Sequence, residues 1–184
     1  MNGSERFIVV TGGPGSGKST LLDALAAEGV AVMPEAGRAI IRDQVAIGGA
    51  ALPWADSAAF AELMLSWEMR SWREADRLPH PVLFDRGVPD VIGYLELCGL
   101  PVPAHVGRAG ELYRYNARVF IAPPWADIYV QDGERKQSLD EAARTHDAMA
   151  AVYGRLGYEL LALPRTPVAE RVRFVRRALG LADV

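Results

Sequence analysis

The chain has 184 residues, of which half are hydrophobic, and it carries a formal net charge of −3. This length and composition exclude an intrinsically disordered chain and allow one domain with a full hydrophobic core. The charge argues against binding to nucleic acid or an anionic membrane, and no apolar run approaches the ~20 residues of a membrane span, so we expect a cytoplasmic protein.

A predicted buried strand over residues 6–12 runs into the glycine-rich sequence TGGPGSGKST. Gly12, Gly17, Lys18 and Ser19 have the spacing of a phosphate-binding loop (P-loop), with a helix predicted to follow, as that loop requires. The backbone N–H groups of such a loop point at phosphates, and the start of the helix adds partial positive charge. We therefore expect a nucleoside triphosphate to bind the loop residues Gly13, Pro14, Gly15, Ser16, Gly17, Lys18, Ser19 and Thr20.

Two side chains of this loop have specific expected contacts. Lys18 is expected to reach the β- and γ-phosphates, and the Ser19 hydroxyl is an expected ligand of Mg²⁺. The alternative, a glycine-rich turn that only caps a helix, would need neither a lysine nor a serine at these positions.

After the predicted helix over residues 18–28 and a short strand over 30–34, the sequence PEAGR begins another helix, over residues 35–46. Parallel sheets bind ligands beyond the carboxyl ends of their strands, so polar residues that follow a strand are candidates for the site. Glu35 and Arg38 lie three residues apart on the first turn of this helix. They either face a phosphoryl acceptor or form an ion pair on the surface.

A long helix is predicted from Asp56, a suitable N-cap, to about residue 78. Phe60, Met64, Trp67 and Ser71 recur along it at helical spacing. Such a stripe is typical of core packing, and we favour that interpretation over a cofactor-binding surface.

The sequence PVLFD, residues 81–85, is an apolar run that ends in an acid, as expected of a buried parallel strand. Asp85 is placed to hold a Mg²⁺-bound water or to accept a proton from an attacking hydroxyl, and Arg86 is placed to contact the acceptor. Pro89 suits the first turn of the next helix, predicted to about residue 97. Capping of that helix is the structural alternative for Asp85.

The remaining predicted elements are a helix over residues 104–115, a strand over 118–122, a helix over 139–156, a strand over 158–164 and a last helix from residue 168. Strands that alternate with helices predict an α/β sandwich with a mainly parallel sheet. Trp125 follows the fourth strand, so we expect it near the acceptor.

The segment around residues 131–146 has the composition of a lid. Its sequence QDGERKQ contains a glycine and two cations, so it can close over the triphosphate while Arg135 stabilises charge on the transferring phosphoryl group. Arg144, on the helix that follows, can add to this charge. The alternative is a solvated turn without a role in catalysis.

Several other reactive or charged residues are predicted to be structural. Cys98 is expected in the core, and the three histidines lie too far apart for a metal site. Arg171, Arg173, Arg176 and Arg177 are expected on the wet face of an amphipathic helix, with an RNA-binding surface as the alternative.

Four stretches together resemble a known family. The sequences VVTGGPGSGKSTLLDAL, PEAGRAIIR, LFDRGVPDVIGYL and IYVQDGERKQ are similar to small P-loop ATP-binding domains of the AAA type, to the kinase domain of bacterial nicotinamide riboside kinases and to nucleoside and nucleotide kinases. The resemblance implies a P-loop NTPase fold over residues 1–184: three layers, a central P-loop strand in a five-stranded parallel sheet, and a kinase-like lid. It also implies that Lys18 and Ser19 hold phosphate and magnesium, that Asp85 is the acid after the third strand, and that Arg135 is a lid arginine.

The favoured function is a kinase that uses ATP and Mg²⁺ to phosphorylate a hydroxyl, or as a weaker alternative a phosphate, of a small molecule. Glu35, Arg38, Arg86 and Trp125 would line its acceptor pocket. A nucleotide-dependent switch that acts on a protein partner and a polynucleotide end kinase are the other hypotheses. The sequence leaves ATP and GTP open as donors and predicts a monomer or dimer, because the sensor motifs of hexameric AAA motors do not occur.

Overall fold

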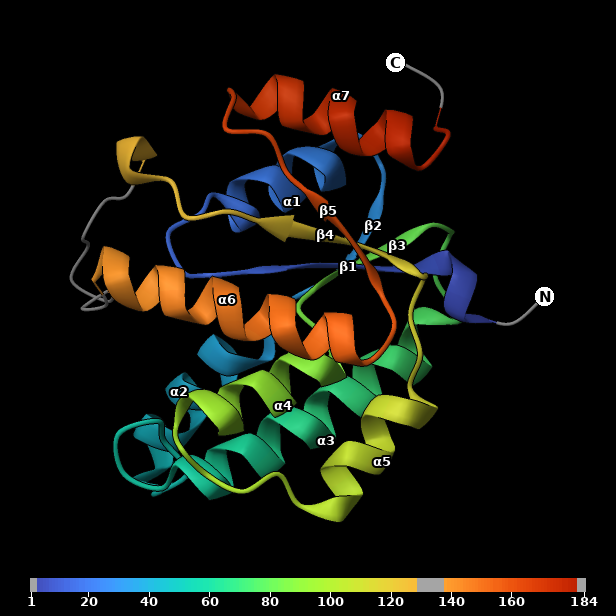
Figure 1. The fold of residues 1–184 in the computed structure, drawn as a ribbon. Coiled ribbons are helices and arrows are strands. Elements are labelled where there is room, and N and C mark those ends of the chain that lie inside the picture. The colour runs from blue at the N-terminus through green and yellow to red at the C-terminus, as the bar shows by residue number, and fades with distance from the viewer. Residues whose placement is uncertain (1–2, 129–137, 182–184) are drawn as a thin grey trace.

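The computed structural model describes residues 3–128 and 138–181, and Figure 1 shows a sheet between layers of helices. The strands are β1 (Phe7–Gly12), β2 (Ala31–Met33), β3 (Val82–Asp85), β4 (Arg118–Ala122) and β5 (Glu159–Ala162). The α-helices are α1 (Lys18–Ala27), α2 (Ala36–Ile47), α3 (Ser57–Ala75), α4 (Val88–Leu97), α5 (Ala104–Leu112), α6 (Leu139–Arg155) and α7 (Val168–Ala178). Short 3-10 helices lie at Gly3–Arg6 and Ala126–Ile128.

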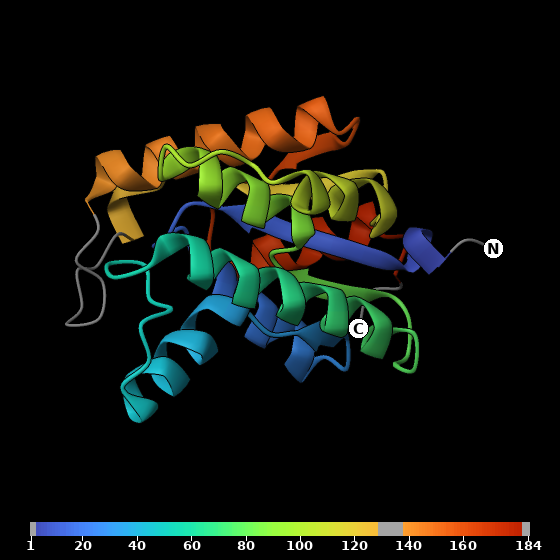
Figure 2. The same ribbon diagram turned by 90° about the horizontal axis from the view of Figure 1, so that it is seen from below.

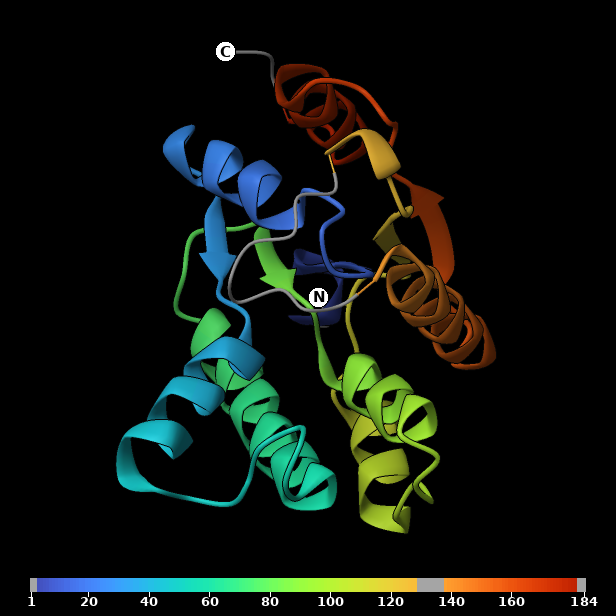
Figure 3. The ribbon, with the colours of Figure 1, turned by 90° about the vertical axis from the view of Figure 1, so that its left-hand side faces the viewer.

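The five strands are all parallel and lie in the order β2-β3-β1-β4-β5. The strand that precedes the P-loop is therefore central, as predicted. Val10 of β1 is in register with Asp85 of β3 and with Phe120 of β4. Because parallel strands end at one edge of the sheet, the segments that follow β1, β2 and β3 meet there, and Figure 3 looks onto this edge.

The sheet is buried on both faces, which explains the continuous apolar runs of its central strands. Phe7 and Val9 point into a core cluster formed with α3, α4, α5 and α6, whereas Ile8 and Val10 point into a second cluster formed with α1 and α7. Figure 1 shows the two helices on one face, and Figure 2, from below, shows the other helices across the opposite face. This is the predicted three-layer α/β sandwich.

Helix α3 begins where its cap predicts. The Asp56 carboxylate accepts a hydrogen bond from the backbone N–H of Ala59 at 2.9 Å. Phe60 is buried in a small cluster with α2, and Ser71 is also buried, whereas Met64 and Trp67 are only partly buried. The predicted stripe is therefore a packing surface, although two of its residues, Phe60 and Met64, also line a cavity.

One prediction about α4 is wrong, and α5 is slightly shorter than predicted. Cys98 is exposed because α4 ends at Leu97 and its last turn, from Glu96 onward, lies at the surface. Helix α5 ends at Leu112, and Tyr115 turns into the core, where its hydroxyl accepts a hydrogen bond from the backbone N–H of Val88 at 3.2 Å.

The prediction of a fully wet arginine face on α7 is also wrong. Arg173 and Arg177 are exposed, but Arg171 and Arg176 are buried. Arg171 donates to backbone carbonyls of the P-loop, and Arg176 pairs with Glu28 of α1 at 2.9 Å. Helix α7 thus presents no continuous row of exposed arginines. None of the helices in the described ranges is long and apolar enough to cross a membrane.

Candidate active site

A cavity of about 1330 Å³ opens at the carboxyl edge of the sheet. This volume exceeds the ~300–1,000 Å³ typical of a single-ligand pocket, so it has room for two molecules. The predicted site residues that line it are Pro14, Gly15, Ser16, Gly17, Lys18, Ser19, Thr20, Glu35, Arg38, Asp85, Arg86, Trp125 and Arg144. Gly13 packs behind the loop, and Arg135 lies outside the described residues.

The P-loop leaves donors free for an anion. Gly17, with φ of 74°, is the N-cap of α1 in the left-handed conformation that glycine adopts without strain. No side chain caps α1, so the first backbone N–H groups of this helix are available to a ligand. Phosphate oxygens are suitable partners for them.

Lys18 is buried within the loop that it serves. Its Nζ donates to the carbonyl oxygens of Gly13 at 2.7 Å and Gly12 at 3.1 Å. Burial, and then the nearby charge of Arg86, lower the pKa of Lys18 to about 8. An anion beside Nζ would favour the charged form of the lysine.

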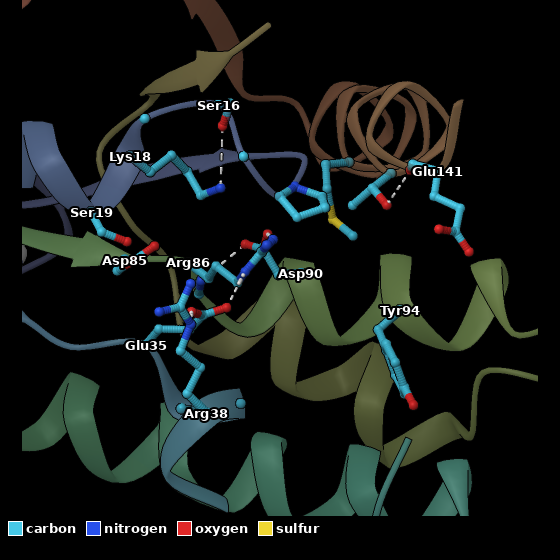
Figure 4. A pocket seen from close by; sticks show the side chains of 18 of the residues that line it. Ser16, Lys18, Ser19, Glu35, Arg38, Asp85, Arg86, Asp90, Tyr94 and Glu141 are labelled. Atoms are coloured by element: carbon cyan, nitrogen blue, oxygen red, sulfur yellow. Dashed lines mark hydrogen bonds and ion pairs between the residues drawn. The ribbon is translucent and has the colours of Figure 1, made fainter. Parts of the chain in front are cut away.

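The residues expected to hold magnesium fit that ion. In Figure 4 the Ser19 hydroxyl and the Asp85 carboxylate point toward one another. Asp85 Oδ1 is buried and has no hydrogen-bond partner among the described residues, and burial raises the pKa of this carboxyl despite the opposing charge of Lys18. Mg²⁺ prefers such oxygen ligands and completes its shell with waters and substrate phosphates.

Arg86 organises the charges between β2 and α4. It is the one described residue other than glycine with a positive φ, 78°. Its Nε donates to Glu35 at 3.0 Å and its Nη1 donates to Asp90 at 3.1 Å. Burial alone would lower the pKa of Arg86, but the surrounding carboxylates outweigh burial and raise it. Arg38 lies 3.5 Å from Glu35, so the surface ion pair considered for these two residues forms at the cavity wall.

Asp90 is a site residue that the sequence reasoning missed. Its carboxylate accepts hydrogen bonds from the Thr11 hydroxyl, from the Tyr153 hydroxyl at 2.7 Å and from the Gly87 N–H at 3.0 Å, in addition to the arginine contact above. The cap of α4 that we considered for Asp85 is thus provided by Asp90. Asp90 follows Arg86 by four residues, a spacing at which oppositely charged side chains can pair, and this spacing could have identified it.

The part of the cavity farthest from the P-loop is largely apolar and was also missed. Phe60 and Met64 of α3 line it, with Tyr94 of α4 packed edge-on against Phe60 at a ring separation of 5.4 Å. Glu68 lines the same cavity and is 5 % exposed. The sequence placed Phe60 and Met64 in a stripe interpreted as core packing, and Glu68, four residues after Met64 on the same helical face, was not considered.

Trp125 lies on the P-loop side of the cavity. The guanidinium of Arg171 lies 5.9 Å from the centre of its ring, and Arg171 Nη1 donates to the carbonyl of Ser16 at 3.0 Å. Trp125 follows β4, which is separated from β2 and Glu35 by the two strands β3 and β1, and it therefore does not lie beside the acceptor residues, where it was expected.

Comparison with known proteins gives a family and a shared fold. A family model described as an AAA domain matches residues 7–171, whereas a comparison with curated proteins finds no match. Deoxyadenosine kinase from M. mycoides, with products dCMP and dCDP bound, is 12% identical with a TM-score of 0.66, covering 95% of this chain and 98% of that one. The NadR protein in complex with NR is 16% identical with a TM-score of 0.70, covering 98% of this chain and 53% of NadR. Thymidylate kinase from Ehrlichia chaffeensis is 16% identical with a TM-score of 0.61, covering 97% of this chain and 100% of that one. At these identities the likeness is one of fold, and it confirms the predicted P-loop NTPase architecture.

Proposed function

This chain belongs to the family of AAA domains, and we propose that it is a kinase that transfers the γ-phosphoryl group of ATP to a hydroxyl of a small molecule. The observation that carries the proposal is the two-part cavity: a complete P-loop at one end, and a chamber of charged and aromatic side chains at the other. A hydrolytic switch needs only the first part. The fold shared with deoxyadenosine kinase and thymidylate kinase supports the same assignment.

The P-loop end would hold the triphosphate. Backbone N–H groups at the start of α1 would bind its oxygens, and Lys18 would exchange its carbonyl contacts for the β- and γ-phosphates. Ser19 and Asp85 would hold Mg²⁺, which supplies positive charge to the phosphates when bound. Arg144 lines the cavity and, with Arg135 outside the described residues, is proposed to add positive charge near the transferring group.

The wall formed by Glu35 and Arg86 would orient the acceptor. The acceptor oxygen would form a bond to the γ-phosphorus as the bond to the bridging oxygen of ADP breaks, and the hydroxyl proton would pass to a carboxylate. Burial raises the pKa of Asp85, whereas Arg86 and Lys18 outweigh burial and lower the pKa of Glu35. Without a bound metal, Asp85 is the better proton acceptor of the two, so its roles as metal ligand and as proton acceptor are alternatives, which the Asp85→Asn protein distinguishes.

A transfer assay with γ-labelled ATP, Mg²⁺ and a panel of small hydroxyl compounds tests this function. We expect one compound to raise ADP release above the acceptor-free rate and to carry the label in equal amount. The Lys18→Ala protein, which loses the phosphate contact, should do neither. Label found only in inorganic phosphate, at a rate that no compound changes, would contradict kinase activity.

A nucleotide-dependent switch is the second candidate. Three large apolar side chains are well exposed at the end of α2 and in the loop that follows: Val45, Ile47 and Trp54, which are 59%, 75% and 68% exposed. Such a group is typical of a surface that contacts a protein. Slow acceptor-independent hydrolysis in the same assay would favour this alternative.

A further inference from the structure

The charges around the acceptor half of the cavity point to the chemical class of the acceptor. We infer that this site takes a molecule of nucleoside type without an anionic group, uncharged or cationic, whose flat ring directs a hydrogen-bond donor or a positive charge at Glu68. The inference rests on the proposed kinase function and deepens it, because the sequence alone left both hydroxyl and phosphate acceptors open.

Carboxyl groups outnumber cations in the interior of this half of the cavity. The lining carboxyl groups are Glu35, Glu68, Asp85 and Asp90, and the buried lining cations near them are Lys18 and Arg86. Lys18 belongs to the triphosphate, and Arg86 is already paired with two carboxylates. An acceptor phosphate here would therefore find no unpaired buried cation among the described residues and would lie beside the Glu35 and Asp90 carboxylates, which costs binding free energy and rejects anionic competitors.

The other described cations near the acceptor are at the rim. The Arg38 side chain is 55% exposed and forms an ion pair with Glu35. Arg144 is exposed on α6. Solvent and salt screen such charges strongly, so they contribute little to holding a buried phosphate.

Glu68 is a buried carboxyl group that lines the cavity and has no hydrogen-bond partner among the described residues. It is 5 % exposed and lines the cavity, and no hydrogen bond from a described residue is among the causes that shift its pKa. Burial, reinforced by the nearby carboxylates of Asp90 and Asp85, raises its pKa well above the usual range. A carboxyl group that lines a cavity and has no hydrogen-bond partner among the described residues is open to a hydrogen bond from a ligand.

The residues beside Glu68 favour a flat ring. Phe60, Met64 and Glu68 lie at successive positions four apart on one face of α3, and Tyr94 packs against Phe60 at an interplanar angle of 67°. A ring that lies along Phe60 and Met64 would therefore have its edge at Glu68. Its hydroxyl-bearing part would extend toward Glu35 and Arg86, the side nearest the P-loop.

Equilibrium binding of matched probes tests the inference. With the P-loop saturated by Mg²⁺ and a non-hydrolysable ATP analogue, calorimetry would measure deoxyadenosine, deoxycytidine, thymidine and nicotinamide riboside against the 5′-monophosphate of each. We expect at least one nucleoside to bind, roughly tenfold or more tightly than its monophosphate. Tighter binding of the monophosphates, or no binding of any nucleoside, would overturn the inference.

Variants of α3 then test Glu68 itself. Glu68→Met, which keeps the length but removes both oxygens, should weaken nucleoside binding roughly tenfold, with the affinity for the ATP analogue unchanged as evidence of an intact fold. Glu62→Gln, on the exposed face of the same helix, is the matched control. Unchanged nucleoside binding in Glu68→Met would remove Glu68 from the acceptor site.

The binding experiment and the transfer experiment can each contradict one proposal without contradicting the other. A protein that binds nucleosides but transfers no phosphoryl group would contradict the kinase proposal and uphold the charge class of the ligand. A protein that phosphorylates monophosphates but not nucleosides would uphold the kinase and overturn the inference.

Discussion

Arg86 is held in a conformation that few residues other than glycine adopt. A positive φ disfavours a side chain with a Cβ, and such strain persists where surrounding contacts over-determine it. Here the backbone N–H of Arg86 donates to the Val10 carbonyl at 3.1 Å, while Glu35 and Asp90 bind its guanidinium. The strained backbone thus sets the guanidinium between the acceptor wall and the start of α4.

The lowered pKa of Lys18, about 8, predicts proton uptake on nucleotide binding. Lys18 is charged below that pH, and a triphosphate favours the charged form, so binding should draw in up to about one proton near pH 8–9 and weaken as pH rises further. Calorimetry with Mg²⁺ and a non-hydrolysable ATP analogue, in two buffers of different ionisation enthalpy, measures this uptake. Lys18→Met should remove it, and a proton count independent of pH in the wild type would contradict the assignment.

Asp85→Asn keeps the side-chain volume and removes the charge. We expect turnover to fall by roughly 10²-fold, with a smaller change in nucleotide affinity, because the carboxylate serves the metal or the hydroxyl proton. A rise in the Mg²⁺ concentration needed for half-maximal rate would identify the metal role. An unchanged Mg²⁺ concentration at half-maximal rate would identify the proton role. Asp23→Asn, exposed on α1, is the control, and normal turnover in Asp85→Asn would exclude both roles.

At the scale of elements, two helices distant in sequence hold the P-loop from either side. A Cβ on Gly13 would lie 2.3 Å from the carbonyl oxygen of Ala142 in α6. A Cβ on Gly17 would lie 2.7 Å from Nη1 of Arg171 in α7. Figure 3 shows both helices beside the loop. The loop is therefore shaped by tertiary contacts before nucleotide arrives, which lowers the ordering cost of binding.

Gly13→Ala should disturb this arrangement. The contact is with a backbone carbonyl, so either the loop or α6 must shift; we expect ATP-analogue affinity to fall roughly tenfold or more and stability to fall by about 1–3 kcal/mol. Calorimetry and urea unfolding measure the two effects. Gly154→Ala on α6, where an added Cβ meets nothing within 4 Å, should instead stabilise by about 0.5–1 kcal/mol. Unaltered nucleotide binding by Gly13→Ala would show that the loop is not held in this way.

At the scale of the whole molecule, one sheet joins two hydrophobic clusters. Alternate residues of β1 belong to different clusters, so separation of either helical layer from the sheet would expose this central strand. We therefore propose that residues 1–184 form one cooperative domain, whose site lies where its layers meet at the carboxyl edge of the sheet.

Scanning calorimetry tests this proposal. We expect one transition with equal calorimetric and van't Hoff enthalpies. A Mg²⁺–ATP analogue at about 100 times its Kd should add about 2.7 kcal/mol and raise the Tm by about 5–10 °C. Lys18→Ala should show the same single transition without the shift. Two separate transitions in the wild type would contradict a single domain.

The sequence by itself determined the elements and the P-loop. The strand at residues 118–122 and the Asp56 cap of α3 were predicted where they occur, and the other helices and strands agree to within a few residues. These features depend on local chemistry: hydrophobic period, capping side chains, and the glycine-lysine-serine spacing that phosphate requires. Such signals lie within a few residues of one another, so they can be recognised without knowledge of the rest of the chain.

Only the tertiary structure decided which faces meet. The burial of Arg171 depends on P-loop carbonyls more than 150 residues earlier in the chain, and the exposure of Cys98 depends on where α4 extends past its neighbours. Asp90 and Glu68 likewise gained their environment from contacts between separate helices and strands. A helix shows its apolar and polar faces in its sequence, but the partner of each face follows from the packing of the whole sheet, because burial and charge depend on atoms that the local sequence does not contain.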